Sequence, residues 1–216
     1  MMNFFRRIKT ILSTEVVGEK SGIYFSKDVI FFIEKGAKII VKGNVTFGFP
    51  LPGLHPFPSY NHSVISLKKD SKLIFHGDAF IANGTGIYLD EGSCLEFAGN
   101  NSVAHNSTIL CKNHIRYGLN AASSWNFNAI DDDGHLFTNI EGVVIPRKKK
   151  PLLIGDNVAI KINVTIPKSV TIGDGAIVGA CTILRSDVEP FTCVYSSSDL
   201  NIKRGVTYAH QLSKRE

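Results

Sequence analysis

The sequence predicts an all-β fold, a parallel β-helix, on three observations. An aliphatic residue recurs at every sixth position through residues 154–190, and a small or branched residue follows four positions after each one. A weaker form of the same period runs through residues 67–127. Glycine and asparagine stand between the apolar segments, where tight corners need left-handed backbone angles. Neither a helical period of 3.6 nor strand alternation gives a strict period of six, whereas short strands joined by turns at a fixed angle do.

Three such segments close a triangle, so about eighteen residues make one coil. The strict sixfold positions are Ile154, Ile160, Ile166, Ile172, Val178 and Leu184, followed four residues later by Val158, Val164, Val170, Ala176, Thr182 and Val188. The weaker positions are Leu67, Leu73, Leu89, Leu95, Val103, Ile109, Ile115, Ala121 and Phe127. Each residue is expected to stack on the one a coil later, at the ~4.8 Å spacing of neighbouring strands. The interior should therefore consist of aliphatic columns.

The composition is that of a soluble globular protein: of 216 residues, 44% are hydrophobic and 20% are charged. No apolar run reaches the ~18–20 residues of a transmembrane helix, and no secretory signal is recognised. The formal charge of +5 suits a polyanionic cofactor or an acidic membrane surface. A nucleic-acid partner is not expected, because it would call for a denser basic patch with aromatic residues between the charges.

The four cysteines, Cys94, Cys111, Cys181 and Cys193, show no paired metal-ligand spacing. Cys94 and Cys111 lie nearly one coil apart and are expected to be neighbours. We interpret the cysteines as buried thiols in a reducing compartment rather than as a disulfide or a metal site. The protein is therefore expected to be cytoplasmic and to hold no metal.

We expect a single domain over residues 1–216. Its parts are an N-terminal segment (1–28), the first coils (29–138), an insertion loop (139–151), further coils (152–195) and a tail or short helix (196–216). Apolar side chains on one helical face predict a short N-terminal helix over Met1–Leu12, packed on the domain or on a partner subunit. The alternative is a helix that lies on a membrane surface near a lipid-linked substrate.

Two segments break the period. Four prolines within residues 47–62 cannot maintain a strand ladder, so this segment is expected to leave the coil, either lining a site or covering the first coil. Residues 137–151 also lose the period and end in the basic run 147–150. That run is either a solvated charged end or a contact for phosphate.

Ionisable residues concentrate just before the second break, in the run Asp131-Asp132-Asp133-Gly134-His135. Gly134 allows a sharp turn, so that His135 can project away from the prism. Neighbouring carboxylates can hold one imidazole tautomer and raise its basicity, as a general base requires. Two other interpretations stay open: a solvated aspartate-rich turn, and a cation site made of convergent carboxylate oxygens.

The motifs Ile-Gly-Asp-Asn-Val (154–158) and Val-Thr-Ile-Gly-Asp (170–174), with the segment 124–135 before them, resemble the hexapeptide-repeat acyltransferases. Within that family the segment is similar to the sugar and polysaccharide O-acetyltransferase branch, and the resemblance covers residues 67–204. It implies a left-handed β-helix that assembles as a homotrimer with acetyl-CoA between two subunits. Left-handed crossovers are exceptional in parallel β-structure, so the handedness comes from the resemblance alone. The implied activity is acetyl transfer to a hydroxyl of a sugar or surface-polysaccharide precursor.

The resemblance also implies catalytic roles. His135 would be the general base that takes the proton from the attacking hydroxyl, and Asp133 or Asp131 would orient its imidazole. A backbone N–H would stabilise the oxyanion. No acyl-enzyme is required, so Cys181 is interpreted as a small packing residue.

Acceptor recognition is implied near the same corner. His105 and Asn106 fall where related enzymes keep an acceptor-binding asparagine. Trp125 would either stack on a sugar face or anchor the contact between subunits.

The cofactor positions that the resemblance implies are Lys161, Ala180, Arg185 and Lys203. The cations would contact the phosphates of acetyl-CoA, and the small Ala180 would admit its pantetheine arm. Two departures stand out: Lys161 replaces a glycine of the family, and residues 196–199 differ from its usual pattern.

Three other functions stay open. An N-acetyltransferase acting on an amino nucleotide-sugar would use the same fold. A zinc hydratase would need three convergent imidazoles, and His105, His114 and His135 have no spacing that places them around one ion. A β-helix without catalysis, serving as a scaffold or binding module, would fit the departures at Lys161 and 196–199.

Overall fold

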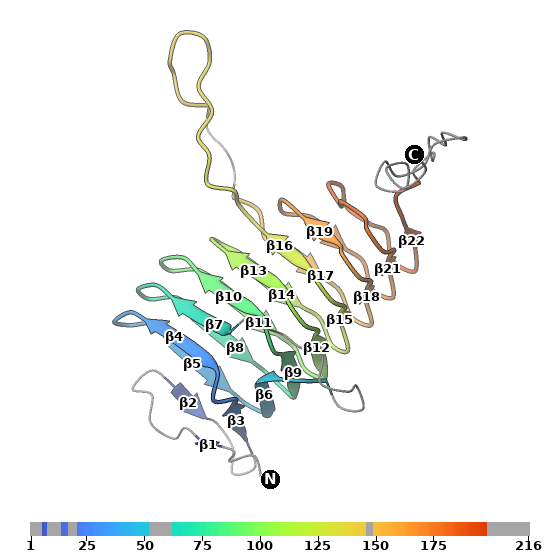
Figure 1. The fold of residues 1–216 in the computed structure, drawn as a ribbon. Helices are drawn as coiled ribbons and strands as arrows, with labels where there is room; N and C mark the ends of the chain where they lie inside the picture. The colour runs from blue at the N-terminus through green and yellow to red at the C-terminus, as the bar shows by residue number, and fades with distance from the viewer. Residues whose placement is uncertain (1–5, 8–13, 17–20, 52–61, 146–148, 198–216) are drawn as a thin grey trace, which may run out of the picture.

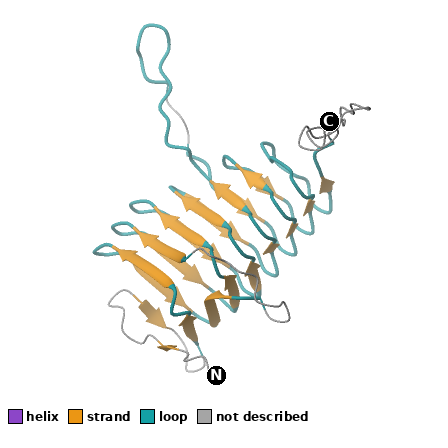
Figure 2. Cartoon of the chain, in the orientation of Figure 1, coloured by secondary structure: helices purple, strands orange, loops and turns teal. Residues whose placement is uncertain are grey.

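Three sheets wrap the chain into a triangular prism. The computed structural model describes residues 6–7, 14–16, 21–51, 62–145 and 149–197. Successive strands pass from one sheet to the next, so that each coil adds a strand to every sheet (Figure 1). Figure 2 shows these strands side by side along the prism, with no helix in the described chain. The all-β, left-handed β-helix expected from the sequence is confirmed.

The sheets are named A, B and C and contain short strands. Sheet A has β1 (Arg6–Arg7), β3 (Gly22–Phe25), β6 (Asn44–Phe49), β9 (Ala79–Ala82), β12 (Asn101–Val103), β15 (Ala122–Ser123), β18 (Ala159–Ile160), β21 (Ile177–Val178) and β22 (Cys193–Val194). Sheet B has β2 (Thr14–Val16), β5 (Lys38–Val41), β8 (Lys72–Phe75), β11 (Cys94–Phe97), β14 (His114–Tyr117), β17 (Leu152–Ile154) and β20 (Thr171–Ile172). Sheet C has β4 (Val29–Ile33), β7 (Ser63–Leu67), β10 (Gly86–Leu89), β13 (Thr108–Cys111), β16 (Asn128–Ile130) and β19 (Thr165–Ile166).

The coils shorten along the prism. Equivalent positions in adjacent coils are 22 residues apart near the N-terminal end, then 20, and 18 after the insertion, as in the pairs Lys68–Asp90, Asn100–Asn120 and Asp156–Asp174. The eighteen-residue expectation therefore holds only for the last coils. Early sides of the prism are four-residue strands with two inward side chains, whereas the last sides are two-residue strands with one. The longer early strands explain why the period was weak there.

Every position of the predicted period is buried. The strand register sets Ile154 opposite Ile172 and Ile160 opposite Val178, as the sequence predicted. Burial of a large aliphatic side chain contributes roughly 1.5–3 kcal/mol, so these columns supply the main stabilising contribution of the late coils.

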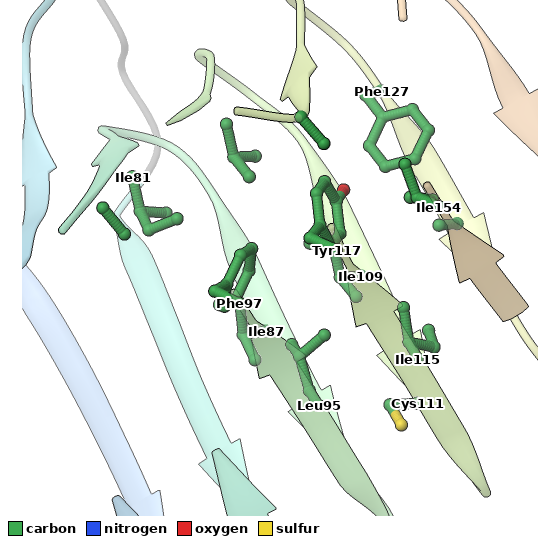
Figure 3. Packing of buried hydrophobic residues seen from close by; sticks show 14 of the residues in the cluster. Ile81, Ile87, Leu95, Phe97, Ile109, Cys111, Ile115, Tyr117, Phe127 and Ile154 are labelled. Atoms are coloured by element: carbon green, nitrogen blue, oxygen red, sulfur yellow. The ribbon is translucent and has the colours of Figure 1, made fainter. Parts of the chain in front are cut away.

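The early coils add an aromatic column that the period of six did not reveal. The rings of Phe75 and Phe97 stack with centroids 5.0 Å apart, and the ring of Tyr117 follows at 4.8 Å from Phe97. Phe97, Tyr117 and Phe127 are seen along the interior in Figure 3. These rings fill the wider cross-section that longer strands create.

Asparagine supplies many of the corners, as expected. In the described residues it takes a positive φ, between 49° and 59°, at Asn100, Asn106, Asn120, Asn126, Asn157 and Asn163. Its side chains also bond from coil to coil. Nδ2 of Asn100 donates to Oδ1 of Asn120 at 2.8 Å, and Nδ2 of Asn120 donates to Oδ1 of Asn157 at 2.9 Å.

The N-terminal end of the prism differs from the sequence expectation. Arg6 and Arg7 form β1, which pairs antiparallel with β3, and β2 extends sheet B beyond β5. The helix predicted over residues 1–12 is therefore wrong where that segment is described, because the exposed edge of sheet A recruits it as a strand. The rest of that segment and residues 198–216 lie outside the described residues. The part of the chain that the structure describes has no helix with the length and hydropathy needed to cross a bilayer.

Two excursions interrupt the coils. The first begins later than expected, since Phe47 is buried within β6. Its residues 52–61 lie outside the described chain. The second is an arm that leaves the prism after β16 and returns at β17 (Figure 1). Thr138 and Val144 form an antiparallel bridge near its tip.

The aromatic column yields a stability prediction. Phe97→Ala removes a fully buried ring that packs between Phe75 and Tyr117, so the free energy of unfolding should fall by about 3–5 kcal/mol. Phe32→Ala removes a ring that is 61% exposed and should change it by about 0.5 kcal/mol or less. Urea unfolding followed by circular dichroism measures both. Equal effects of the two substitutions would contradict the packing role of the column.

Candidate functional site

Asp131 is a buried structural residue of the coil and is not exposed on its surface. Its side chain is buried, and the residue directly follows the last residue of β16 in sheet C. Oδ1 accepts a hydrogen bond from the N–H of Lys112 at 2.7 Å, and Oδ2 accepts from the N–H groups of Asn113 at 2.8 Å and His114 at 2.7 Å. Because the preceding coil engages both carboxylate oxygens, Asp131 is a poor candidate to orient His135 or to hold a cation.

The residues after it form a turn that presents His135. Oδ1 of Asp132 accepts from the N–H of Gly134 at 2.8 Å, and Oδ1 of Asp133 accepts from the N–H of His135 at 3.1 Å. Such bonds from an aspartate to the backbone two residues on stabilise a tight turn. Asp133 and His135 are both exposed. Of the two aspartates considered as orienting groups, Asp133 is the one bonded within this turn.

Lys112 of the preceding coil fastens the turn. Its Nζ donates to the carbonyl of Asp133 at 3.2 Å. Gly134 has φ of 76°, and a Cβ there would come within 2.3 Å of that ammonium. The sequence did not single out Lys112, because it lies 21 residues from Asp133. Lys112 could have been found in the sequence if a coil length of 20 residues had been recognised there.

Ser169 holds the base of the arm together. Its Oγ lies 2.7 Å from the carbonyl oxygen of Asp131 and 2.5 Å from that of Lys150, the two points where the chain departs and returns. Beyond this base the arm carries apolar side chains that the described chain leaves exposed, namely Leu136, Phe137, Ile140, Val143, Val144 and Ile145. The turn with His135 therefore has a fixed origin, and the apolar arm extends beyond it.

The predicted acceptor residues lie on another edge of the prism. We call it the A–C edge, where each strand of sheet A turns into the next strand of sheet C. Asn106 and Trp125 are partly exposed there. The N–H of Asn163 donates to the carbonyl of Trp125 at 2.9 Å, so this edge continues directly into the late coils.

His105 lies on the same edge but is only 1% exposed. Its Nε2 accepts a hydrogen bond from the N–H of Leu51 at 3.4 Å, and its ring centroid is 6.4 Å from that of Trp125. Burial lowers the pKa of His105, against an opposing backbone hydrogen bond with Asn83. This burial argues against direct contact between His105 and an acceptor.

The predicted cofactor residues divide between two places. Lys161 and Ala180 lie on the A–C edge in adjacent coils and are exposed; the N–H of Lys161 donates to the carbonyl of Val178 at 2.9 Å. Arg185 is exposed across sheet C from them, beyond the strand segment that pairs with β19. Lys203 lies outside the described residues.

The arm and the A–C edge are therefore separated within one chain. Trp125 and Asp131 stand at opposite ends of one side of the prism, and six residues of extended chain span roughly 15–20 Å. From Asp131 the arm leads away from the prism (Figure 1). A general base must come within hydrogen-bond reach of the proton it takes. The predicted residues of one chain thus do not form one compact site.

The histidines considered for a zinc hydratase do not converge. His105 is buried on the A–C edge, His114 begins β14 in sheet B, and His135 is exposed on the arm. Three imidazoles from three parts of the prism cannot bind one ion in a single chain.

Comparison with known proteins identifies the repeat. Residues 152–186 match the family model described as bacterial transferase hexapeptide (six repeats). A curated relative, the bifunctional protein GlmU of Methanococcus vannielii, is 28% identical over 131 residues, which are 59% of this chain and 30% of that protein. The chain thus spans less than a third of that relative. The hexapeptide repeats recognised in the sequence are confirmed for residues 152–186.

Solved structures with a similar course of the chain include two acetyltransferases and an N-acyltransferase. The polysialic acid-specific acetyltransferase NeuO is 20% identical, with 91% of this chain and 89% of that chain covered and a TM-score of 0.47. The polysialic acid O-acetyltransferase OatWY is 18% identical, with 91% and 94% covered and a TM-score of 0.40. A variant of AntD, an N-acyltransferase from Bacillus cereus solved with dTDP and coenzyme A, is 16% identical, with 98% and 96% covered and a TM-score of 0.46.

The position of Asp131 leads to a prediction that separates structural from catalytic aspartates. Asp131→Ala leaves three backbone N–H groups without their acceptor, so the free energy of unfolding should fall by about 2–4 kcal/mol. Asp133→Ala removes one exposed contact and should cost about 0.5 kcal/mol. Chemical denaturation of the two variants gives the comparison. If Asp131→Ala is as stable as Asp133→Ala, the carboxylate does not hold the corner.

Proposed function

Because residues 152–186 carry the hexapeptide repeats of bacterial transferases, we propose that this chain is an acetyl-CoA-dependent O-acetyltransferase acting on a sugar hydroxyl, in a surface polysaccharide or its precursor. The observation that carries the proposal is the exposed His135, presented by an aspartate-braced turn at the point where the coils are interrupted. A histidine in that setting suits a general base at neutral pH.

The proposed reaction is a direct transfer. His135 takes the proton of the acceptor hydroxyl as its oxygen attacks the thioester carbonyl. The carbon–sulfur bond then breaks, and the coenzyme A thiolate leaves with the proton that His135 returns. Asp133 stabilises the turn and the positive charge that develops on the imidazole, and a backbone N–H stabilises the oxyanion.

The A–C edge is the proposed cofactor wall. Ala180 leaves room for the pantetheine arm, and the exposed ammonium of Lys161 lies one coil away for a phosphate. Arg185 offers a second cation across sheet C, and Lys203 is a further proposed contact. Trp125 and Asn106 contact the acceptor in this proposal, being partly exposed where His105 is buried.

The separation between His135 on the arm and the A–C edge supports a homotrimer. One chain holds His135 roughly 15–20 Å or more from the A–C edge, so its own base does not reach a thioester bound there. In a cyclic trimer the arm of each subunit meets the A–C edge of the next, which completes three equivalent sites. The exposed apolar side chains of the arm supply a surface for that contact.

Removal of the base is the first test. His135→Ala should lower kcat/KM for acetyl transfer about 10²–10⁴-fold while the thermal shift caused by acetyl-CoA remains. His76→Ala removes an exposed histidine that follows β8 of sheet B, away from both the arm and the A–C edge, so it is the matched control and should keep full activity. A screen of sugars and oligosaccharides read by mass spectrometry supplies the acceptor. Cleavage of the product by hydroxylamine distinguishes an ester from an amide, and full activity of His135→Ala refutes the assignment of the base.

Subunit complementation tests the shared site. His135→Ala lacks the base, and Ala180→Trp obstructs the A–C edge, so each homotrimer should be inactive. Dissociation and reassembly of a 1:1 mixture should restore about a quarter of wild-type activity, since a site works only when an intact arm meets an intact edge. A mixture that stays inactive although mixed trimers form would show that each site lies within one chain.

A further inference from the structure

A second cluster of reactive side chains lies on the outer face of sheet B, away from the arm. Cys94 and Glu96 point outward from β11, and His114 points outward from β14, opposite Cys94 in the strand register. The thiol, a carboxylate oxygen and an imidazole nitrogen all lie within 4.8 Å of one another. All three residues are partly buried. Sulfur, oxygen and nitrogen donors of this kind are the ligands that zinc takes in proteins.

Hydrogen bonds hold the carboxylate in the middle of this cluster. Oε1 of Glu96 is 2.8 Å from Nε2 of His114, and Oε2 is 2.8 Å from Nε2 of His76, which follows β8. Burial pushes the pKa of Glu96 up, but the hydrogen bonds from the two histidines outweigh it and leave the pKa below its ordinary value. Glu96 is therefore an ionised carboxylate fixed between imidazoles of the coils before and after it.

We propose that Cys94, Glu96 and His114 bind a zinc ion that links adjacent coils, with one coordination position left open. His76 holds the second oxygen of Glu96 and so positions the carboxylate, as outer hydrogen-bond partners do at metal sites.

The distances require only small movements. Tetrahedral zinc with bonds of ~2.0–2.3 Å sets its ligand atoms about 3.3–3.6 Å apart. The Glu96–His114 pair, now 2.8 Å apart, opens by about half an ångström as the ion enters, and the Cys94 thiol closes on it. Burial, with a contribution from Glu96, raises the pKa of Cys94 to about 11, so zinc displaces a proton from the thiol when it binds.

The charged groups around the site influence how tightly zinc binds and what occupies the open position. The thiolate and carboxylate together neutralise a divalent ion. Lys72 lies opposite Cys94 and Arg116 opposite Glu96 in the strand register, and both are exposed. These cations weaken zinc binding relative to a site without them, and they favour an anion or a water at the open position.

This site could not be recognised from the spacing of residues along the chain, because its ligands come from different coils. Cys94 and Glu96 are close in sequence, but His114 lies 18 residues beyond Glu96 and His76 lies 20 residues before it. The cysteine spacing led us to expect no bound metal. The geometry of this cluster leads us to propose one instead. This proposal does not depend on the proposed acetyl transfer, because the ligands lie on sheet B and not on the arm or the A–C edge.

Metal titration of the 216-residue chain tests the site. After chelation and dialysis, isothermal titration with Zn²⁺ should give one ion per chain, and Co²⁺ should produce the near-ultraviolet absorption of a cobalt–thiolate bond. Cys94→Ser should remove that absorption and weaken zinc binding at least 100-fold. His76→Asn should weaken it about 10–100-fold with unchanged stoichiometry. Cys181→Ser keeps the other thiols and, being exposed on the A–C edge, should behave as wild type.

Stability supplies a second readout that acetyl transfer does not influence. Zinc should raise the thermal midpoint of the wild type and of Cys181→Ser, and should leave that of Cys94→Ser unchanged. Circular dichroism and gel filtration of the metal-free variants verify the fold, and Glu96→Gln gives an independent ligand variant. If Cys94→Ser and Glu96→Gln are folded and bind zinc like the wild type, or if the wild type takes up none, the cluster is a hydrogen-bonded network only.

Discussion

The structure depends on the corner at which each side of the prism turns into the next. A corner needs one residue with a left-handed backbone angle, which asparagine tolerates better than most residues, and it leaves polar groups that need partners. Stacked asparagines meet both needs, since the amide of Asn100 bonds Asn120 and that of Asn120 bonds Asn157. At another edge, where sheet C turns into sheet B, the carboxylate of Asp131 bonds three N–H groups of the corner in the preceding coil. Once the corners are fixed, the inward side chains stack without further adjustment.

This dependence explains how much the sequence could predict. The late coils have one inward residue per side, so their period is strict, and the buried column from Ile154 onward followed directly. In the early coils two inward residues per side blur the period, and the column through Phe97 and Tyr117 was missed. Contacts between coils are harder still, because the partners of a residue such as Lys112 depend on a coil length that changes along the chain.

The candidate site shows the same limit. The turn Asp131–His135 was recognised from local composition; in the structure Asp132 and Asp133 bond its backbone and His135 is exposed, whereas Asp131 is buried. The burial of His105 was not foreseeable from its local sequence, and the N–H of Leu51, 54 residues earlier in the chain, bonds its Nε2. The frame of a repetitive scaffold is thus readily predicted from its sequence, whereas contacts between residues far apart in the chain are not.

The decreasing coil length has a consequence for how such a chain can change. Coils of 22, 20 and 18 residues follow one another, so each coil fits only neighbours of nearly its own perimeter. Deleting a middle coil would set a wide, aromatic-filled triangle against a narrow aliphatic one, and strands at the junction would lose their partners. Duplication at the narrow end meets no such mismatch, because successive units there have equal perimeters. The prism therefore tapers toward its C-terminal end. Extra coils can be added at that end without a mismatch, whereas a coil in the middle cannot be deleted without one.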